Sequence, residues 1–125
     1  SARFNFYDVH YNAVHVAGNS GGNTDDLVES LELMASGAID PAAMITHIGG
    51  LDCVVETTLN LPHIPGGKKL IYTQISLPLT PLAELRTRAS GNPMFGPLAD
   101  IVERRGGLWS VEAERYLLAH ARPID

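Results

Sequence analysis

The alternation of short apolar segments with glycine-rich breaks over residues 13–59 is the feature that most constrains the fold of this chain. The segments are, in order, an apolar strand at 13–17, a glycine-rich loop at 18–22, a helix at 24–36, a strand at 44–48 and a helix at 51–59. Leucines at helical spacing indicate the first helix, which Asn23 or Thr24 can cap and Gly37 can end. Strands that alternate with helices predict an α/β fold.

The first residues of the chain are rich in aromatic and β-branched types, which favours strands over residues 3–10 and 13–17. Aromatic side chains between Phe4 and Tyr11 fall on both faces of the first strand, so this strand suits a partner on each side. An exposed edge of this kind would invite aggregation. Two partners remain open. A second copy of the chain would make Phe4–Tyr11 a dimer strand, and an internal hairpin would pair it within the chain.

The second half of the chain begins with a loop rich in proline and glycine and continues as a strand over residues 68–74, which we expect to be central in its sheet. Three short helices are then predicted, over residues 82–89, 93–105 and 110–121. Asn92 and Ser110 are suitable N-caps for the last two helices. The composition becomes more helical after Pro78, so the tail is interpreted as an appended helical layer.

Composition and charge argue against several classes of function. The 125 residues carry a formal net charge of -5 with only nine scattered Lys and Arg residues, so we expect no nucleic-acid surface. The longest apolar runs fall far short of the ~20 residues that cross a bilayer, so we expect no membrane span. Cys53 is the single cysteine and no charged-then-apolar leader is visible, so we expect a reducing, cytoplasmic location.

The candidate catalytic side chains do not form a recognisable set. The five histidines are His10, His15, His47, His63 and His120. No two of them have the spacing of a helical zinc pair, so each is interpreted as a structural histidine rather than a metal ligand. Cys53 has no basic neighbour in the sequence that would activate its thiol, and an inert buried cysteine is the better interpretation.

The loop between Gly18 and Gly22 joins a strand to a helix, a place where backbone N–H groups can bind an anion. Its sequence matches neither G-x-G-x-x-G nor G-x-x-x-x-G-K-[ST]. Asp25 and Asp26, which suit the helix start, would repel a phosphate there. A tight structural connection and an anion-binding loop both remain open.

The order of these segments resembles the C-terminal third of the zinc-dependent medium-chain dehydrogenases/reductases. The matching residues are Gly18, Gly37, Ile39-Asp40-Pro41, Met44-Ile45-Thr46-His47 and Gly66-Gly67-Lys68-Lys69-Leu70-Ile71-Tyr72. Within this family the chain is most similar to the L-sorbose 1-phosphate reductase-like and sorbitol dehydrogenase-like proteins. That closer likeness is carried by Asn23-Thr24-Asp25-Asp26, Thr46-His47-Ile48-Gly49-Gly50-Leu51-Asp52 and Thr57-Thr58-Leu59-Asn60-Leu61-Pro62.

The resemblance implies an NAD(P) oxidoreductase that acts on a polyol or a sugar phosphate, with zinc in the parent protein. Residues 1–59 would be the C-terminal part of a Rossmann-like nucleotide-binding domain with a dimer strand, and residues 60–125 a return strand and a helical C-terminal extension. Gly18, Asn19 and Ser20 would contact NAD or NADP near its nicotinamide end. No catalytic residue and no metal ligand is carried over.

The resemblance also implies that this chain is a fragment. The zinc ligands and the G-x-G-x-x-G turn of the family lie in an N-terminal part of the parent chain that is not in this sequence. We therefore expect neither tight cofactor binding nor activity from this chain alone. Two other functions remain open: a standalone α/β module that dimerises or binds a small anion through residues 18–22, and a hydrolase that uses Cys53.

Overall fold

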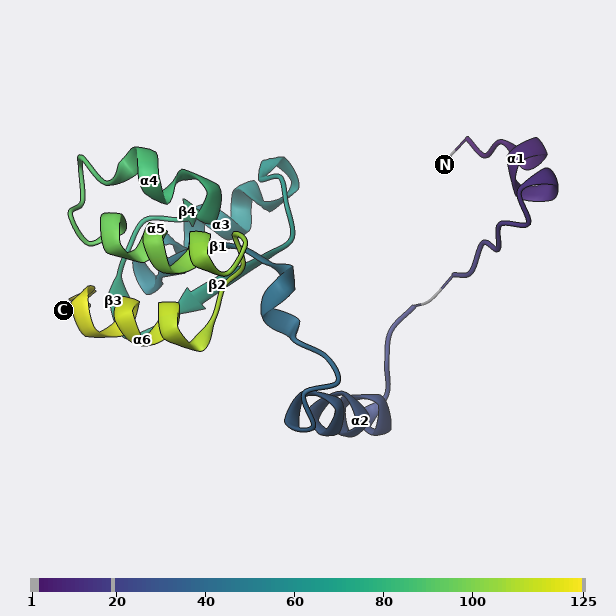
Figure 1. Cartoon of the computed structure of the whole chain (residues 1–125), viewed down its shortest axis with the longest axis horizontal. Helices are drawn as coiled ribbons and strands as arrows, with labels where there is room; N and C mark the ends of the chain where they lie inside the picture. Colours follow the sequence, from purple (N-terminus) through teal and green to yellow (C-terminus); the bar gives the residue numbers. More distant parts are fainter. Residues whose placement is uncertain (1–2, 19, 125) are drawn as a thin grey trace. The chain divides into compact units, whose positions relative to one another are not determined.

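The structure is a computed structural model that describes residues 3–18 and 20–124 (Figure 1). Its contacts divide the chain into two units, Ser1–Ile39 and Asp40–Asp125, and each is described by itself. This division falls before the strand predicted at residues 44–48. The resemblance implied a different boundary, at residue 59, between two domains of the parent enzyme. That boundary stays a prediction.

The described residues of the first unit form two helices, α1 at Phe6–Tyr11 and α2 at Thr24–Ala35, and neither has a buried residue. The strand predicted between Phe4 and Tyr11 is therefore wrong. Residues 14–18 adopt no regular structure, so the second predicted strand is wrong as well.

Local capping explains why the aromatic segment is helical. The Asn5 side-chain oxygen accepts a hydrogen bond from the Tyr7 backbone N–H at 3.1 Å, which starts α1. Tyr7 and Tyr11 then meet one turn apart, with ring centroids separated by 4.4 Å. Aromatic residues favour a strand mainly through cross-strand neighbours, and no strand lies in the described part of this unit to supply them.

The start and end of α2 follow the sequence prediction. Asn23 Oδ1 accepts from the backbone N–H groups of Asp25 and Asp26 at 2.7 and 3.1 Å. Asp26 Oδ2 accepts from the Asn23 N–H at 2.7 Å, which completes a capping box. Gly37, just beyond the helix, has a φ of 74°. This is the left-handed conformation that favours glycine at a helix end.

The apolar stripe predicted for α2 is present but uncovered. Leu27 and Leu31 are 66% and 62% exposed. A helix of this length gains most of its stability from packing an apolar face against other elements. The first unit does not supply that packing.

The second unit contains the remaining elements. The strands are β1 (Ile45–Gly50), β2 (Lys68–Tyr72), β3 (Ile75–Ser76), β4 (Thr80–Pro81) and β5 (Arg122–Pro123), and the α-helices are α3 (Val54–Asn60), α4 (Leu85–Arg88), α5 (Phe95–Arg104) and α6 (Val111–His120). Short 3-10 turns occupy η1 (Pro41–Met44), η2 (Leu51–Cys53), η3 (Leu61–His63) and η4 (Leu82–Glu84). The predicted mixed α/β class is confirmed. No helix in the described ranges is long and apolar enough to cross a membrane.

β1 is the central strand of the main sheet, whose order is β2-β1-β4. It pairs in parallel with β2, where Ile48 lies opposite Leu70, and antiparallel with β4, where Ile48 lies opposite Thr80. A second sheet joins β3 to β5. The expectation that residues 68–74 form the central strand is therefore wrong, because β2 has one partner and β1 has two.

The core of the second unit lies between β1 and the helices α4, α5 and α6, which run from green to yellow in Figure 1. Ile48, Leu85, Leu98 and Leu117 are all fully buried in it. Burying a side chain of this size contributes about 1.5–3 kcal/mol. This core makes the second unit self-contained in a way that the first unit is not.

A buried hydrogen-bond chain links β2 to the helical layer. Trp109 Nε1 donates to Tyr72 Oη at 3.0 Å, and Tyr72 Oη donates to Glu114 Oε2 at 2.7 Å. Burial, followed by the hydrogen bond to Glu114, raises the pKa of Tyr72 well above its usual value. Tyr72 therefore stays a neutral donor that ties the sheet to α6.

Gly49 and Gly50 are the last residues of β1, which therefore extends two residues beyond the strand predicted at 44–48. The Gly50 N–H donates to the Leu77 carbonyl at 2.8 Å. A Cβ on Gly50 would lie 2.5 Å from the Leu77 nitrogen and closer still to the Ile75 carbonyl oxygen. Both neighbours are backbone atoms that cannot move aside alone, so this approach requires glycine.

We therefore expect Gly50→Ala to destabilise the second unit by about 1–3 kcal/mol, because the added methyl group forces the backbone segments apart. Gly96→Ala is the matched control, since a Cβ there meets nothing within 4 Å. Urea unfolding followed by Trp109 fluorescence measures both. Equal stabilities of the two variants would contradict the close approach.

Candidate functional site

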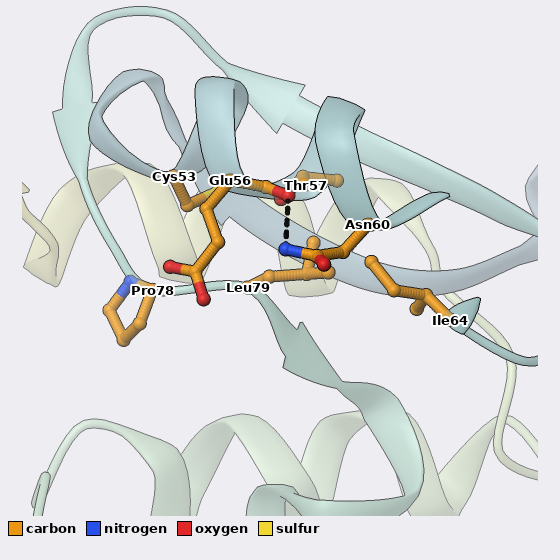
Figure 2. Close-up of a pocket in the computed structure, with 7 residues that line it drawn as sticks. All are labelled: Cys53, Glu56, Thr57, Asn60, Ile64, Pro78 and Leu79. Atoms are coloured by element: carbon orange, nitrogen blue, oxygen red, sulfur yellow. Dashed lines mark hydrogen bonds between the residues drawn. The ribbon is translucent and has the colours of Figure 1, made fainter. Parts of the chain in front are cut away.

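A cavity of about 340 Å³ lies between α3 and the segment that leads into β4 (Figure 2). Its lining residues are Cys53, Glu56, Thr57, Asn60, Ile64, Pro78 and Leu79. Three parts of the second unit supply them: the η2–α3 stretch, the loop before β2, and residues 78–79. Each part is held by a distinct set of hydrogen bonds.

The helical wall carries the polar groups of the cavity. Glu56 and Asn60 are four residues apart in α3, a spacing that places them on the same face. Asn60 Nδ2 donates to the Glu56 backbone carbonyl at 3.0 Å, the dashed line in Figure 2. The Glu56 carboxylate extends from the helix toward Pro78 in the same view.

Asp52 fixes the opposite wall. Its Oδ2 accepts from the Ser76 hydroxyl at 2.6 Å, and its Oδ1 accepts from the Leu77 backbone N–H at 3.0 Å. The hydrogen bond from Ser76, followed by that from Leu77, lowers the pKa of Asp52 below its usual value. Because Pro78 and Leu79 follow directly, the Asp52 carboxylate determines where they lie.

Lys69 fixes the third wall, which is the loop before β2. Its Nζ donates to the backbone carbonyls of Ile64, Pro65, Gly66 and Gly67 at 3.3, 3.0, 3.3 and 2.8 Å. A single ammonium group thus shares its three N–H donors among four backbone carbonyl groups of a loop that makes no strand pairing. Ile64 is held at the cavity by this arrangement.

Cys53 is buried at the edge of the cavity, as the sequence predicted, with 9% of its surface exposed. Its Sγ donates to the Gly50 carbonyl at 3.1 Å. The lining of this cavity contains no histidine, lysine or arginine that would favour the thiolate. The geometry therefore gives the hydrolase hypothesis no activated nucleophile.

The residues predicted to contact the cofactor lie in the first unit. Gly18 and Ser20 are exposed, and Asn19 falls outside the described residues. The Asn23 side chain already accepts from the N–H groups of Asp25 and Asp26, which an anion at the start of α2 would need. Cofactor contact by Gly18, Asn19 and Ser20 stays a prediction.

The described histidines show no metal-binding arrangement. No group of three or more His, Cys, Asp or Glu side chains in the described ranges is placed to hold a metal ion. His47 is buried in β1, and its Nδ1 lies 2.9 Å from the Thr46 hydroxyl. Burial, followed by the charge of Lys69, lowers the pKa of His47. His47 is thus a hydrogen-bonded structural histidine.

Sequence reasoning did not identify the Asp52 and Lys69 contacts. Asp52 follows Gly49-Gly50-Leu51 directly, and a carboxylate after a glycine pair at a strand end was the available signal. Its partners lie 24 and 25 residues further along the chain. Local spacing therefore does not reveal them.

Comparison with known proteins gives three similar relatives. The chain is 55% identical over 116 residues to the protein YggP of Escherichia coli strain K12, covering 93% of this chain and 27% of that protein. It is 50% identical to a mannitol-1-phosphate 5-dehydrogenase of Aliivibrio fischeri, and the match covers 92% of this chain and 27% of that protein. It is 52% identical to an L-sorbose 1-phosphate reductase of Klebsiella pneumoniae, and the match covers 99% of this chain and 28% of that protein.

The chain is thus homologous to a segment of these proteins and spans just over a quarter of their length. The expected likeness to L-sorbose 1-phosphate reductase is confirmed. No protein-family model matches the chain, and no solved structure does.

The Asp52 contacts predict a pH dependence of stability. Because the folded pKa lies below the ordinary value of 3.8, the contribution of Asp52 is complete above that value and is lost as pH falls through the folded pKa. We expect Asp52→Asn to be less stable than the unmodified chain at about pH 7, with a difference that shrinks as the pH falls below about 4.

Urea unfolding at a series of pH values measures this difference. Asp25→Asn is the control, because it removes the same charge from the first unit. A difference between Asp52→Asn and the unmodified chain that stays constant down to about pH 2 would contradict the assignment.

Proposed function

We propose that this chain is part of an NAD(P)-dependent oxidoreductase that acts on a polyol or a sugar phosphate. The observation that carries the proposal is the 52% identity to an L-sorbose 1-phosphate reductase over 99% of this chain. The identity to a mannitol-1-phosphate 5-dehydrogenase points to the same class of substrate. The parent enzyme would move a hydride between the carbinol carbon of the substrate and nicotinamide.

The chain would contribute scaffold and part of the cofactor cleft. In this proposal residues 1–59 belong to a Rossmann-like domain, and Gly18, Asn19 and Ser20 lie near the nicotinamide. The exposed apolar face of α2 supports this role, because Leu27 and Leu31 require a partner that the first unit does not contain. The parent chain would supply that partner.

Subunit contact is proposed for the segment between Phe4 and Tyr11. Its aromatic side chains are exposed in the first unit, and Phe6 is 77% exposed. Clustered aromatic side chains of this kind are enriched in protein interfaces. The contact would be made by the helix α1.

The described residues do not fit a zinc site, so zinc has no place in the role proposed for this chain. In the medium-chain dehydrogenase/reductase family that the sequence resembles, zinc polarises the substrate oxygen. Such a metal would be held by parts of the parent protein outside this sequence. We expect the chain alone to show no dehydrogenase turnover.

A chimeric enzyme tests the proposal. The matching segment of the Klebsiella pneumoniae reductase is replaced by this chain, and oxidation of reduced nicotinamide with L-sorbose 1-phosphate is followed by absorbance. We expect the kcat/KM of the chimera to lie within about tenfold of that of the unmodified reductase. This corresponds to an increase of at most about 1.4 kcal/mol in the activation free energy.

Two controls accompany the chimera. The same chimera with Gly50→Ala is expected to lose stability, and the isolated chain is expected to show no turnover. A chimera that folds and binds nicotinamide cofactor but does not reduce any sugar phosphate would contradict the proposal. Turnover by the isolated chain would contradict the fragment role.

A further inference from the structure

We propose that the cavity between α3 and residues 78–79 binds a small organic cation, namely a primary ammonium group on a short alkyl chain. This site is separate from the proposed cofactor contacts of Gly18, Asn19 and Ser20. The inference does not depend on the proposed oxidoreductase function, and either one stands if the other fails.

Each polar side chain of the cavity offers a hydrogen-bond acceptor, and the carboxylate of Glu56 offers acceptors alone. Glu56 provides a carboxylate, and no salt bridge engages it within the described part of the chain. Asn60 uses one N–H of its Nδ2 on the Glu56 carbonyl, which leaves Oδ1 as an acceptor and the second N–H as a donor. A ligand that complements these groups must therefore bring donors.

Thr57 shows that the cavity has an unused polar group. This residue is 8% exposed, and its hydroxyl makes no hydrogen bond to any residue that the structure describes. No fully buried side-chain oxygen or nitrogen in the described ranges lacks a partner, so the Thr57 hydroxyl keeps some exposed surface, and Thr57 lines the cavity. A polar group in this position costs stability unless a ligand or water completes its hydrogen bonding.

The rest of the lining sets the remaining chemistry of the ligand. Ile64, Pro78 and Leu79 give apolar walls that suit an alkyl chain. Among the residues that the structure describes, no lysine, arginine or histidine lines this cavity, so no described side chain there would balance the charge of a phosphate. An ammonium group has three donors and a positive charge, which matches one carboxylate and two neutral oxygens.

Titration of the full chain with n-butylammonium chloride tests the proposal. Amide chemical shifts are followed at constant ionic strength, and n-butanol and inorganic phosphate serve as comparison probes. We expect saturable shifts confined to residues 53–64 and 76–80 with n-butylammonium, and no saturable shifts with phosphate. Binding should weaken as salt concentration rises, because Glu56 is exposed to solvent.

Two variants identify the groups involved. Glu56→Gln should weaken n-butylammonium binding by about tenfold, whereas Glu29→Gln in α2 removes the same charge and should leave binding unchanged. Thr57→Val removes the hydroxyl with little change in volume and should weaken binding by about threefold while the chain stays folded.

The titration distinguishes cation recognition from binding to an apolar pocket. Saturable ammonium binding that Glu56→Gln weakens supports the site. Equal binding of n-butanol, or equal binding by Glu56→Gln and the unmodified chain, would show an apolar pocket without cation recognition and would overturn the proposal. The absence of any saturable shift would also overturn it.

Discussion

The close approach of Gly50 to the backbone of Ile75 and Leu77 is the contact on which the second unit depends. Because Gly50 has no Cβ, its N–H reaches the Leu77 carbonyl at 2.8 Å. Asp52 is then positioned to accept from Ser76 and from the Leu77 N–H. These bonds join the end of β1 to the chain that enters β4. The central strand, its antiparallel neighbour and one wall of the cavity are therefore set by one glycine and one carboxylate.

The helices other than α1 could be predicted from sequence because their determinants are local. The leucine spacing of α2, its Asn23 cap and its Gly37 end lie within a few residues of one another, and the structure confirms them. Strands were harder to predict, because β3, β4 and β5 have two residues each and are too short to show an alternation of apolar and polar residues. The prediction for the segment between Phe4 and Tyr11 was wrong because its composition suits a strand. A strand needs a neighbouring strand, and the described residues of the first unit supply none.

The candidate site could likewise be predicted only where its determinants are local in sequence. Cys53 and Glu56 could be placed on one short helical stretch from the sequence alone. The walls opposite them are fixed by Asp52 and by the four carbonyl bonds of Lys69, and the partners of Asp52 are distant in sequence. The cavity is therefore a product of tertiary contacts. The family resemblance, by contrast, was carried by short motifs whose order could be recognised without any contact.

The two units differ in how much of their own stability they supply. The second unit buries a continuous apolar core around Ile48, whereas the helices of the first unit bury no residue. Relatives of which this chain spans just over a quarter have much more chain with which to cover such helices. In the role that we propose, the first unit belongs to a larger protein and depends on packing supplied by the rest of it.

Amide hydrogen exchange tests this account most directly. It is measured on the isolated chain and on the same sequence placed within the Klebsiella pneumoniae reductase. We predict slow exchange in β1 and α5 in both settings, and exchange in α2 that is fast in the isolated chain and slow within the reductase. Equally slow exchange of α2 in the isolated chain would contradict the account, because the first unit would then be stable without a partner.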